Sequence, residues 1–202
     1  MSPNPFANPK IAVEYEAWYT TENRQADRQE KALLIQMLVR FPQAHTLLEV
    51  GCGTGHFTRW FGELELQAVG LDLSCPMINE ATNLSIQSYI QGEAQMLPFQ
   101  SKSFDLAASI TALEFLQEPT HALVEMVRVA RQGIILGVLN SESYLGRQYQ
   151  RKGGPIWEAA HFFSIAELMH LIRKVVGEQP IITWRTTLWP YGQERCLYPG
   201  VV

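Results

Sequence analysis

A short glycine-rich segment offers the clearest chemistry in the chain. Residues 49–55 read EVGCGTG and lie between an apolar run and an amphipathic one, where a strand would end and a helix begin. Glycines at such a junction let the backbone turn tightly and approach a ligand closely. The free N–H groups of a helix start favour a polar or anionic group. Since strand-to-helix turns also need glycine for structural reasons, the segment alone leaves both interpretations open.

An acidic residue stands near the end of the next apolar run. Asp72 belongs to QAVGLDL, residues 67–73, and in a doubly wound fold a carboxylate at this strand end can accept hydrogen bonds from a ribose diol. The alternative is that Asp72 caps the following helix, although Ser74 could serve as that cap. The glycine segment and Asp72 together favour a nucleoside-type ligand.

Two ligand classes share this geometry, and the spacing separates them. Dinucleotide-binding proteins carry G-x-G-x-x-G with a pyrophosphate on the helix start, whereas Gly51, Gly53 and Gly55 follow G-x-G-x-G. The carboxylate of Glu49 would repel a pyrophosphate but attract an ammonium group. These features favour an amino-acid-bearing nucleoside and count against the alternative, a nicotinamide-dependent oxidoreductase.

Alternating strands and helices are expected to position these residues. The predicted strands are Thr46–Val50, Gln67–Leu73, Ser88–Gln91, Ser103–Ile110, Gly133–Leu139 and Ile181–Leu188. Helices are predicted over 23–41, after the glycine segment, over 76–83 and 119–130, and from the Ser164/Glu167 capping box to near Gly177. Apolar strands alternating with amphipathic helices predict an α/β, Rossmann-like doubly wound fold with a mostly parallel sheet.

The remaining segments are less regular. Residues 1–10 carry three prolines and predict a loose tail, and residues 11–20 predict a short aromatic helix. Residues 140–160 predict a long polar loop or short helices, and a connection of that length is usually functional or mobile.

Three stretches resemble the UbiE-related (type 11) branch of class I S-adenosylmethionine-dependent methyltransferases over about residues 15–140. They are LLEVGCGTGHFT, VGLDLS and GEAQMLPFQSKSFDLAASITALEFLQEP, which are specific in combination and weak singly. The resemblance implies the class I methyltransferase fold in one domain, 1–202. Residues 1–45 would form an N-terminal helical cap, 46–139 the cofactor-binding core, and 140–202 the acceptor-side loop, helix and final strands. The implied cofactor is S-adenosyl-L-methionine, with S-adenosyl-L-homocysteine as product.

The resemblance also assigns roles. The methionine portion of the cofactor would contact Glu49, the backbone of Gly51, Cys52, Gly53 and Gly55, and the backbone of Thr111, with His56 bordering it. The ribose would contact Asp72, and the adenine would contact Leu73, Met77, Glu93 and Ala94. Tyr19, with Tyr15 and Trp18, matches an aromatic segment that folds over the cofactor in this family, or it packs on the core.

The sequence departs from the family pattern at three places. Glu93 replaces the usual Asp, and Glu114 stands where many relatives carry a histidine. The family sheet usually ends with an antiparallel seventh strand, but Cys196–Val202 is short and contains Pro199. That strand is expected to be truncated, distorted or missing.

Methyl transfer needs a base only when the acceptor holds its proton tightly. The weak candidates for a catalytic base are Glu114 and His161, and a structural role is favoured for each. The aromatic stretch Tyr144–Phe163 is expected to cover a site for an apolar or planar small-molecule acceptor, or else to pack the loop onto the sheet.

The composition argues against several other classes of protein. The chain has 202 residues, 47% of them hydrophobic, and a formal net charge of −4, which argues against a nucleic-acid-binding surface. Three cysteines without metal-ligand spacing predict neither a zinc site nor disulfides. Lacking a signal-like N-terminus and a membrane-spanning run, the chain is expected to be cytoplasmic. It is also expected to be a monomer or homodimer. The alternative function is a non-catalytic S-adenosylmethionine/S-adenosylhomocysteine-binding module or regulatory subunit.

Overall fold

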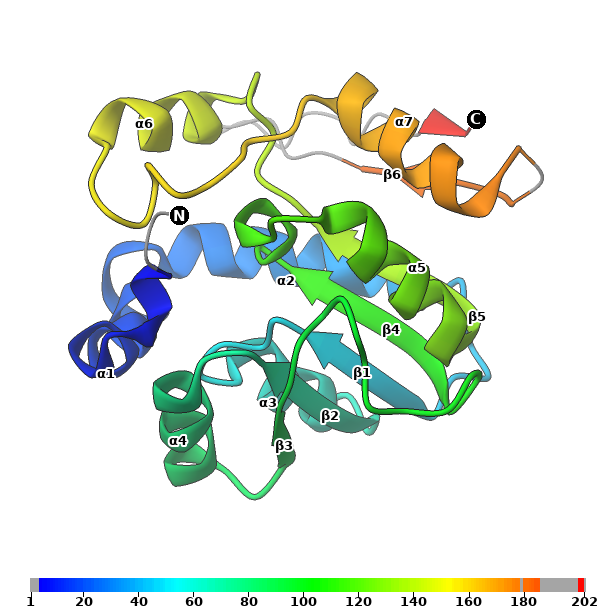
Figure 1. The fold of residues 1–202 in the computed structure, drawn as a ribbon, viewed down its shortest axis with the longest axis horizontal. Helices are drawn as coiled ribbons and strands as arrows, with labels where there is room; N and C mark the ends of the chain where they lie inside the picture. The colour runs from blue at the N-terminus through cyan, green and yellow to red at the C-terminus, as the bar shows by residue number, and fades with distance from the viewer. Residues whose placement is uncertain (1–3, 179, 186–199, 202) are drawn as a thin grey trace.

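The computed structural model describes residues 4–178, 180–185 and 200–201. Its centre is a parallel five-stranded sheet in the order β3-β2-β1-β4-β5 (Figure 1). The strands are β1 (Thr46–Val50), β2 (Gln67–Asp72), β3 (Ser88–Gln91), β4 (Phe104–Ile110) and β5 (Ala130–Gly137). The α/β doubly wound architecture expected from the sequence is confirmed.

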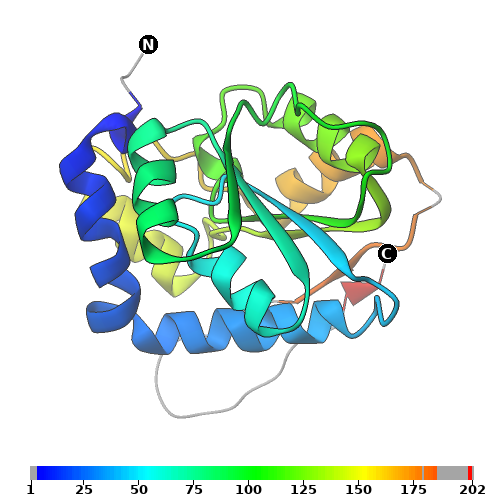
Figure 2. The ribbon, with the colours of Figure 1, turned by 90° about the horizontal axis from the view of Figure 1, so that it is seen from below.

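Helices cover both faces of this sheet. Helices α2 (Arg24–Leu38) and α3 (His56–Glu63) pack on one face, whereas α5 (Pro119–Val129) and α7 (Ile165–Val176) pack on the other. Figure 2 shows α2 in blue on the opposite side of the sheet from α5 in green and α7 in orange. Helix α4 (Cys75–Leu84) packs on β2 and β3.

Alternation along the strands divides the apolar core in two. Leu47 and Leu106 are buried with Phe61 on the α2–α3 face, while Leu48 and Ala107 are buried on the α5–α7 face. Successive strand side chains point to opposite faces, so strands buried on both sides must be apolar throughout.

The order in which successive strands are added to the sheet reverses at β1. Strand β1 pairs with β2 on one side and with β4 on the other, and both pairings are parallel. Ligands of open α/β sheets bind outside the carboxyl ends of strands at such a switch point. The glycine segment begins at this end of β1.

The N-terminal segment is more ordered than the proline content predicts. A short 3-10 turn, η1 (Pro5–Ala7), leads into α1 (Pro9–Ala17) and then a π-helical turn, η2 (Trp18–Glu22). The side chains of Asn4 and Asn8 accept hydrogen bonds from the following backbone N–H groups, and a proline begins each helix. The predicted loose tail is therefore wrong for residues 5–10, because prolines here start helices. The short helix predicted for 11–20 is confirmed within α1 and η2.

The C-terminal part contains α6 (Tyr144–Lys152) in the predicted irregular stretch and α7 with its Ser164/Glu167 capping box. Two-residue strands β6 (Thr183–Trp184) and β7 (Gly200–Val201) pair antiparallel with each other, not with the five-stranded sheet. Of the predicted strand Ile181–Leu188, only Thr183–Trp184 is a strand in the described residues, and 186–188 lie outside them. The expected seventh strand also falls mostly outside them. None of the described helices has the length and apolar character needed to cross a membrane.

Candidate cofactor and acceptor site

The glycine segment turns sharply after β1. Gly51, Gly53 and Gly55 have φ values of 77°, 54° and 77°, in the left-handed region that favours glycine. The backbone N–H groups of Gly51 and Cys52 donate to the carbonyl of Leu71 at 2.7 and 3.0 Å. The turn is therefore held against the end of β2.

Asp72 faces this turn from the end of β2. Its Oδ2 accepts from the backbone N–H of Gly53 and its Oδ1 from that of Ser74, each at 2.8 Å. Burial raises the pKa of Asp72 despite these hydrogen bonds. A carboxylate offers about four acceptor positions, so the two bonds leave capacity for the hydroxyls of a ribose. Ser74 caps α4 with its own side chain, so capping does not require Asp72.

Glu49 is the second carboxylate at this edge of the sheet. It is 1% exposed, and the hydroxyl of Thr58 donates to its Oε2. Burial raises the pKa of Glu49 to about 8. Burying an acid without an opposite charge is unfavourable, and a ligand ammonium would supply that charge.

The residues expected around the adenine flank α4. Met77 and Ala94 are buried at 1% and 8% exposure, whereas Leu73 is 57% exposed. Glu93 is exposed and accepts a hydrogen bond from the side chain of Gln95 at 2.9 Å. The chain thus brings apolar and acidic groups together after β2 and β3, and their roles toward adenine stay predictions.

Thr111 stands at the carboxyl end of β4 in an unusual conformation. Its φ is 50°, and its backbone N–H donates to the carbonyl of Gly137 at 2.8 Å. A left-handed β-branched residue is strained, and such residues cluster at functional sites. This geometry suits the backbone role predicted for Thr111.

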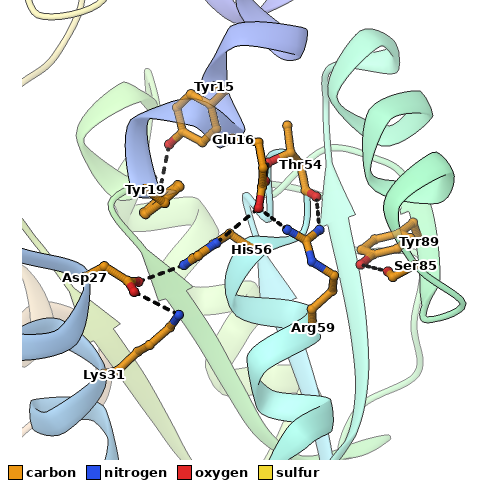
Figure 3. A network of polar contacts seen from close by, with 10 residues as sticks. All are labelled: Tyr15, Glu16, Tyr19, Asp27, Lys31, Thr54, His56, Arg59, Ser85 and Tyr89. Carbon is orange, nitrogen blue, oxygen red and sulfur yellow. Dashed lines mark hydrogen bonds and ion pairs between the residues drawn. The ribbon is translucent and has the colours of Figure 1, made fainter. Parts of the chain in front are cut away.

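A clasp formed by Glu16, Thr54, His56 and Arg59 ties α1 to the glycine segment (Figure 3). The carboxylate of Glu16 accepts from Thr54 Oγ1 at 2.8 Å, from the Arg59 guanidinium, and lies 3.4 Å from His56 Nδ1. Burial tends to raise the pKa of Glu16, but the hydrogen bonds from His56 and Thr54 and the charge of Arg59 lower it to about 2. The clasp therefore holds the N-terminal helices against the segment.

The same histidine extends the contact to α2. His56 Nε2 lies 2.7 Å from Asp27 Oδ1, and Lys31 donates to Asp27 Oδ2 at 3.0 Å. The ring of Tyr19 stacks on His56 at 3.9 Å between centroids. Tyr19 is buried and shares a hydrogen bond with Tyr15 at 3.4 Å. These contacts place both tyrosines beside the glycine segment.

A cavity of about 1470 Å³ opens next to this site, between α2, β5, α6 and α7. Aromatic side chains from the predicted stretch line it, namely Tyr144, Tyr149 and Trp157, together with Trp18. The rings of Tyr149 and Trp157 are stacked with centroids 4.1 Å apart. Phe163 instead packs into the core on the α5–α7 face. Part of the stretch thus lines a cavity and part packs onto the core, and its role toward an acceptor stays a prediction.

The two candidate bases occupy different surroundings. Glu114 is 1% exposed in the short turn η3 (Leu113–Phe115), and its Oε1 accepts from the backbone N–H of Leu139 at 2.5 Å. Burial raises its pKa to about 7. The side chain of His161 is 58% exposed, and its Nε2 lies 2.7 Å from Glu167 Oε1. Neither Glu114 nor His161 is among the residues that line the cavity, and a base role for either stays a prediction.

Two acidic residues of the site were missed from the sequence. Glu16 lies on α1 and Glu30 lines the cavity from α2. A detectable signal existed for Glu30, because it lies four residues before Leu34 and so continues the apolar stripe of that helix. A charged residue on a buried helix face calls for a functional explanation. No comparable pattern marked Glu16.

The described residues contain no group of three or more His, Cys, Asp or Glu side chains arranged to hold a metal ion. The polar side chains beside the glycine segment are instead the carboxylates of Glu49 and Asp72, which keep free acceptor positions. They fit a ligand with hydroxyl and ammonium groups.

Comparison with known proteins agrees with this chemistry. The family model described as a methyltransferase domain matches residues 48–137. A crystal structure from Thermotoga maritima, described as a SAM-dependent methyltransferase and possible histamine N-methyltransferase, is 29% identical with a TM-score of 0.73, covering 97% of this chain and 90% of that one. The chain belongs to the S-adenosylmethionine-dependent methyltransferases. The expected family and cofactor are thereby confirmed.

Two curated relatives of this methyltransferase show how far the similarity extends. An uncharacterised protein of Methanocaldococcus jannaschii is 31% identical over 170 residues, which are 82% of this chain and 78% of that protein. Malonyl-[acyl-carrier protein] O-methyltransferase of Yersinia pestis is 30% identical over 159 residues, 72% of this chain. The chain spans only 60% of the length of the Yersinia enzyme.

Proposed function

We propose that this methyltransferase transfers the methyl group of S-adenosylmethionine to a small-molecule acceptor bound in the aromatic-lined cavity. The observation that carries the proposal is the turn at Gly51–Gly55, flanked by the buried Glu49 and the partly buried Asp72 at the carboxyl ends of adjacent strands. In this arrangement Glu49 would hold the ammonium of the cofactor and Asp72 its ribose hydroxyls. Residues 1–202 would act as one domain, with residues 1–45 as its cap.

The protein's part in the reaction is positioning. Bound S-adenosylmethionine supplies an activated methyl group, and the chemistry belongs to the cofactor. The cavity must hold the acceptor at near-attack distance and exclude water. Tyr149 and Trp157 give it a flat apolar wall, which suits a planar or apolar body.

We call the Gly51–Gly55 turn, Glu49 and Asp72 together the cofactor cradle. Titration calorimetry with S-adenosylhomocysteine tests this cradle. Asp72→Ala removes the ribose acceptor, and Gly53→Val imposes a side chain where φ is 54°. Each lost charge-assisted interaction costs about 1.5–3 kcal/mol, so the affinity of Asp72→Ala should fall roughly 10- to 100-fold. Gly154→Val is the matched control, because Gly154 has a φ of 90° with nothing within 4 Å of an added Cβ.

Folded Asp72→Ala and Gly53→Val variants with undiminished affinity would refute the cradle. Transfer of a labelled methyl group to an acceptor panel then separates an enzyme from a non-catalytic binding module. The similarity to proteins named as methyltransferases favours the enzyme.

A further inference from the structure

The cavity contains an acidic end that the cofactor cradle does not use. Glu30 lines the cavity from α2, and the hydroxyl of Thr111 lies 3.4 Å from its Oε1. A Cβ added to Gly137, the last residue of β5, would lie 3.5 Å from the same oxygen. The carboxylate of Glu30 is therefore placed over the carboxyl ends of β4 and β5.

A second carboxylate, Glu114, stands in the turn after β4 and its charge acts on Glu30, although it is not among the residues that line the cavity. Glu114 is 1% exposed, and its Oε2 is buried without a hydrogen-bond partner among the residues that the structure describes. Its Oε1 is bound to the backbone N–H of Leu139, which lines the same cavity. An unpaired buried carboxylate oxygen is costly, and a positive charge bound nearby would offset part of that cost.

The electrostatics of this end support the same conclusion. Burial, the charge of Glu114 and the charge of Asp27 raise the pKa of Glu30 to about 7, and Thr111 and Lys31 oppose them. The pKa of Tyr15 responds to Glu30 as well as to Asp72 and Glu49. Tyr15 lines the same cavity as Glu30, and its Cε1 would lie 3.6 Å from a Cβ added to Gly53, so this cavity reaches the glycine segment.

We propose that Glu30 is the receptor for a protonated amine of the acceptor, that the nearby charge of Glu114 strengthens this attraction, and that Glu30 takes the proton which the amine nitrogen must lose before methylation. This inference rests on the proposed methyl-transfer function. It identifies the acceptor as a primary or secondary amine on a planar or apolar body. The aromatic wall suits the planar or apolar body of such an amine, and its rings can attract the ammonium charge through cation–π interaction.

The proposed step balances. The ammonium gives one proton to the Glu30 carboxylate, and the freed lone pair forms a bond to the methyl carbon. The carbon–sulfur bond breaks with its electron pair left on sulfur, so the positive charge moves from sulfur to nitrogen. The products are the N-methylated ammonium and S-adenosylhomocysteine.

A carboxylate acceptor fits this end poorly, because two acids would repel it. The cavity does carry arginines, but Arg131 is at the start of β5 and pairs with Asp105 at 3.0 Å. Arg40 lies beyond the end of α2. Arg131 thus lies at the opposite end of β5 from Gly137, the residue beside Glu30. A third lining arginine, Arg185, follows β6, and its Nη1 donates to the carbonyl of Trp184 at 3.0 Å.

Three indole probes of equal body and different charge test the inference. Tryptamine, tryptophol and indole-3-acetate are titrated calorimetrically into protein saturated with S-adenosylhomocysteine. We expect tryptamine to bind most tightly and indole-3-acetate most weakly. Glu30→Gln should weaken tryptamine roughly 10- to 100-fold, as expected for a lost charge-assisted hydrogen bond, and leave S-adenosylhomocysteine affinity unchanged. Glu63→Gln, an exposed carboxylate on α3, is the matched control.

Each other outcome has a distinct meaning. Equal or tighter binding of tryptophol or indole-3-acetate, or no tryptamine binding at millimolar concentration, overturns the amine receptor. An equal loss of S-adenosylhomocysteine affinity in Glu30→Gln would assign Glu30 to the cofactor ammonium and also overturn it. Failure of the wild-type protein to bind S-adenosylhomocysteine would instead refute the proposed function. Thermal unfolding by circular dichroism shows that each variant is folded.

Discussion

Gly51 has two independent reasons to be glycine. Its φ is 77°, and an added Cβ would lie 2.3 Å from the Cβ of Ala112. Gly51→Ala should therefore combine backbone strain with overpacking and lower the free energy of unfolding by about 2–4 kcal/mol. Urea unfolding of the purified variant measures this change.

Gly154→Ala separates the two causes. Gly154 has a φ of 90°, but nothing lies within 4 Å of an added Cβ. It should lose only the strain contribution, about 1–2 kcal/mol. Equal losses in the two variants would show that the contact with Ala112 does not constrain the turn.

At this scale, the sequence predicted residues whose chemistry depends on local spacing. Glu49, Asp72 and the glycines follow from strand ends and one turn, and the structure brings them together as expected. Glu16 depends on a partner 38 residues away, Thr54. A single sequence holds no pattern that predicts such a long-range pair.

The clasp at Glu16 makes the N-terminal helices an element of the cofactor site. Glu16→Gln removes the charge that pairs with Arg59 and weakens the acceptor for Thr54 and His56. Backbone amides of α1 should then exchange with solvent roughly 10-fold faster, as expected for a loss of about 1.4 kcal/mol. Hydrogen–deuterium exchange with mass spectrometry measures this protection.

Glu14→Gln is the control for the clasp, because Glu14 lies on the same helix and is exposed. It should leave exchange of α1 unchanged. If Glu16→Gln also leaves it unchanged, then packing of Tyr15 and Tyr19, and not the clasp, holds the helix in place.

Elements were predicted well where burial imposes a regular pattern. Strands Thr46–Val50 and Ser88–Gln91 were predicted with the observed bounds, and the Ser164/Glu167 capping box was found as expected. Helix α2 ends at Leu38, before the predicted end at residue 41. The largest errors are at the N-terminus and at Thr183–Trp184. There short caps and the choice of strand partner decide the structure, and neither leaves a periodic pattern.

At the scale of the whole molecule, the carboxyl edge of the sheet concentrates buried and partly buried acids. Glu49, Glu30 and Glu114 come from β1, α2 and the turn η3, so no local segment contains the group. Burial raises their pKa values to about 8, 7 and 7. The apolar cores on both faces of the sheet stabilise the fold despite this unfavourable placement of acids. Bound ligands are expected to offset part of its energetic cost.

This concentration predicts how the cofactor-free protein responds to pH. Each acid has a folded-state pKa above its ordinary value of 4.5. Between about pH 5 and about pH 8 the folded state therefore binds more protons than the unfolded state, and the free energy of unfolding falls as pH rises. Each group contributes on the order of 1 kcal/mol per pH unit while it titrates. Glu16, with its pKa near 2, acts oppositely, and its stabilisation is lost only below about pH 4.

Thermal unfolding across this range checks the sign. The Tm of the cofactor-free protein should fall from about pH 5 to about pH 8, because buried carboxyl groups lose their protons without gaining partners. Glu49→Gln removes one of these groups and should flatten the fall. Saturating S-adenosylhomocysteine should flatten it as well, since its ammonium would pair with the Glu49 carboxylate. A Tm that rises over this range would show that these acids are ionised in the folded protein at low pH and already neutralised by charges within the fold.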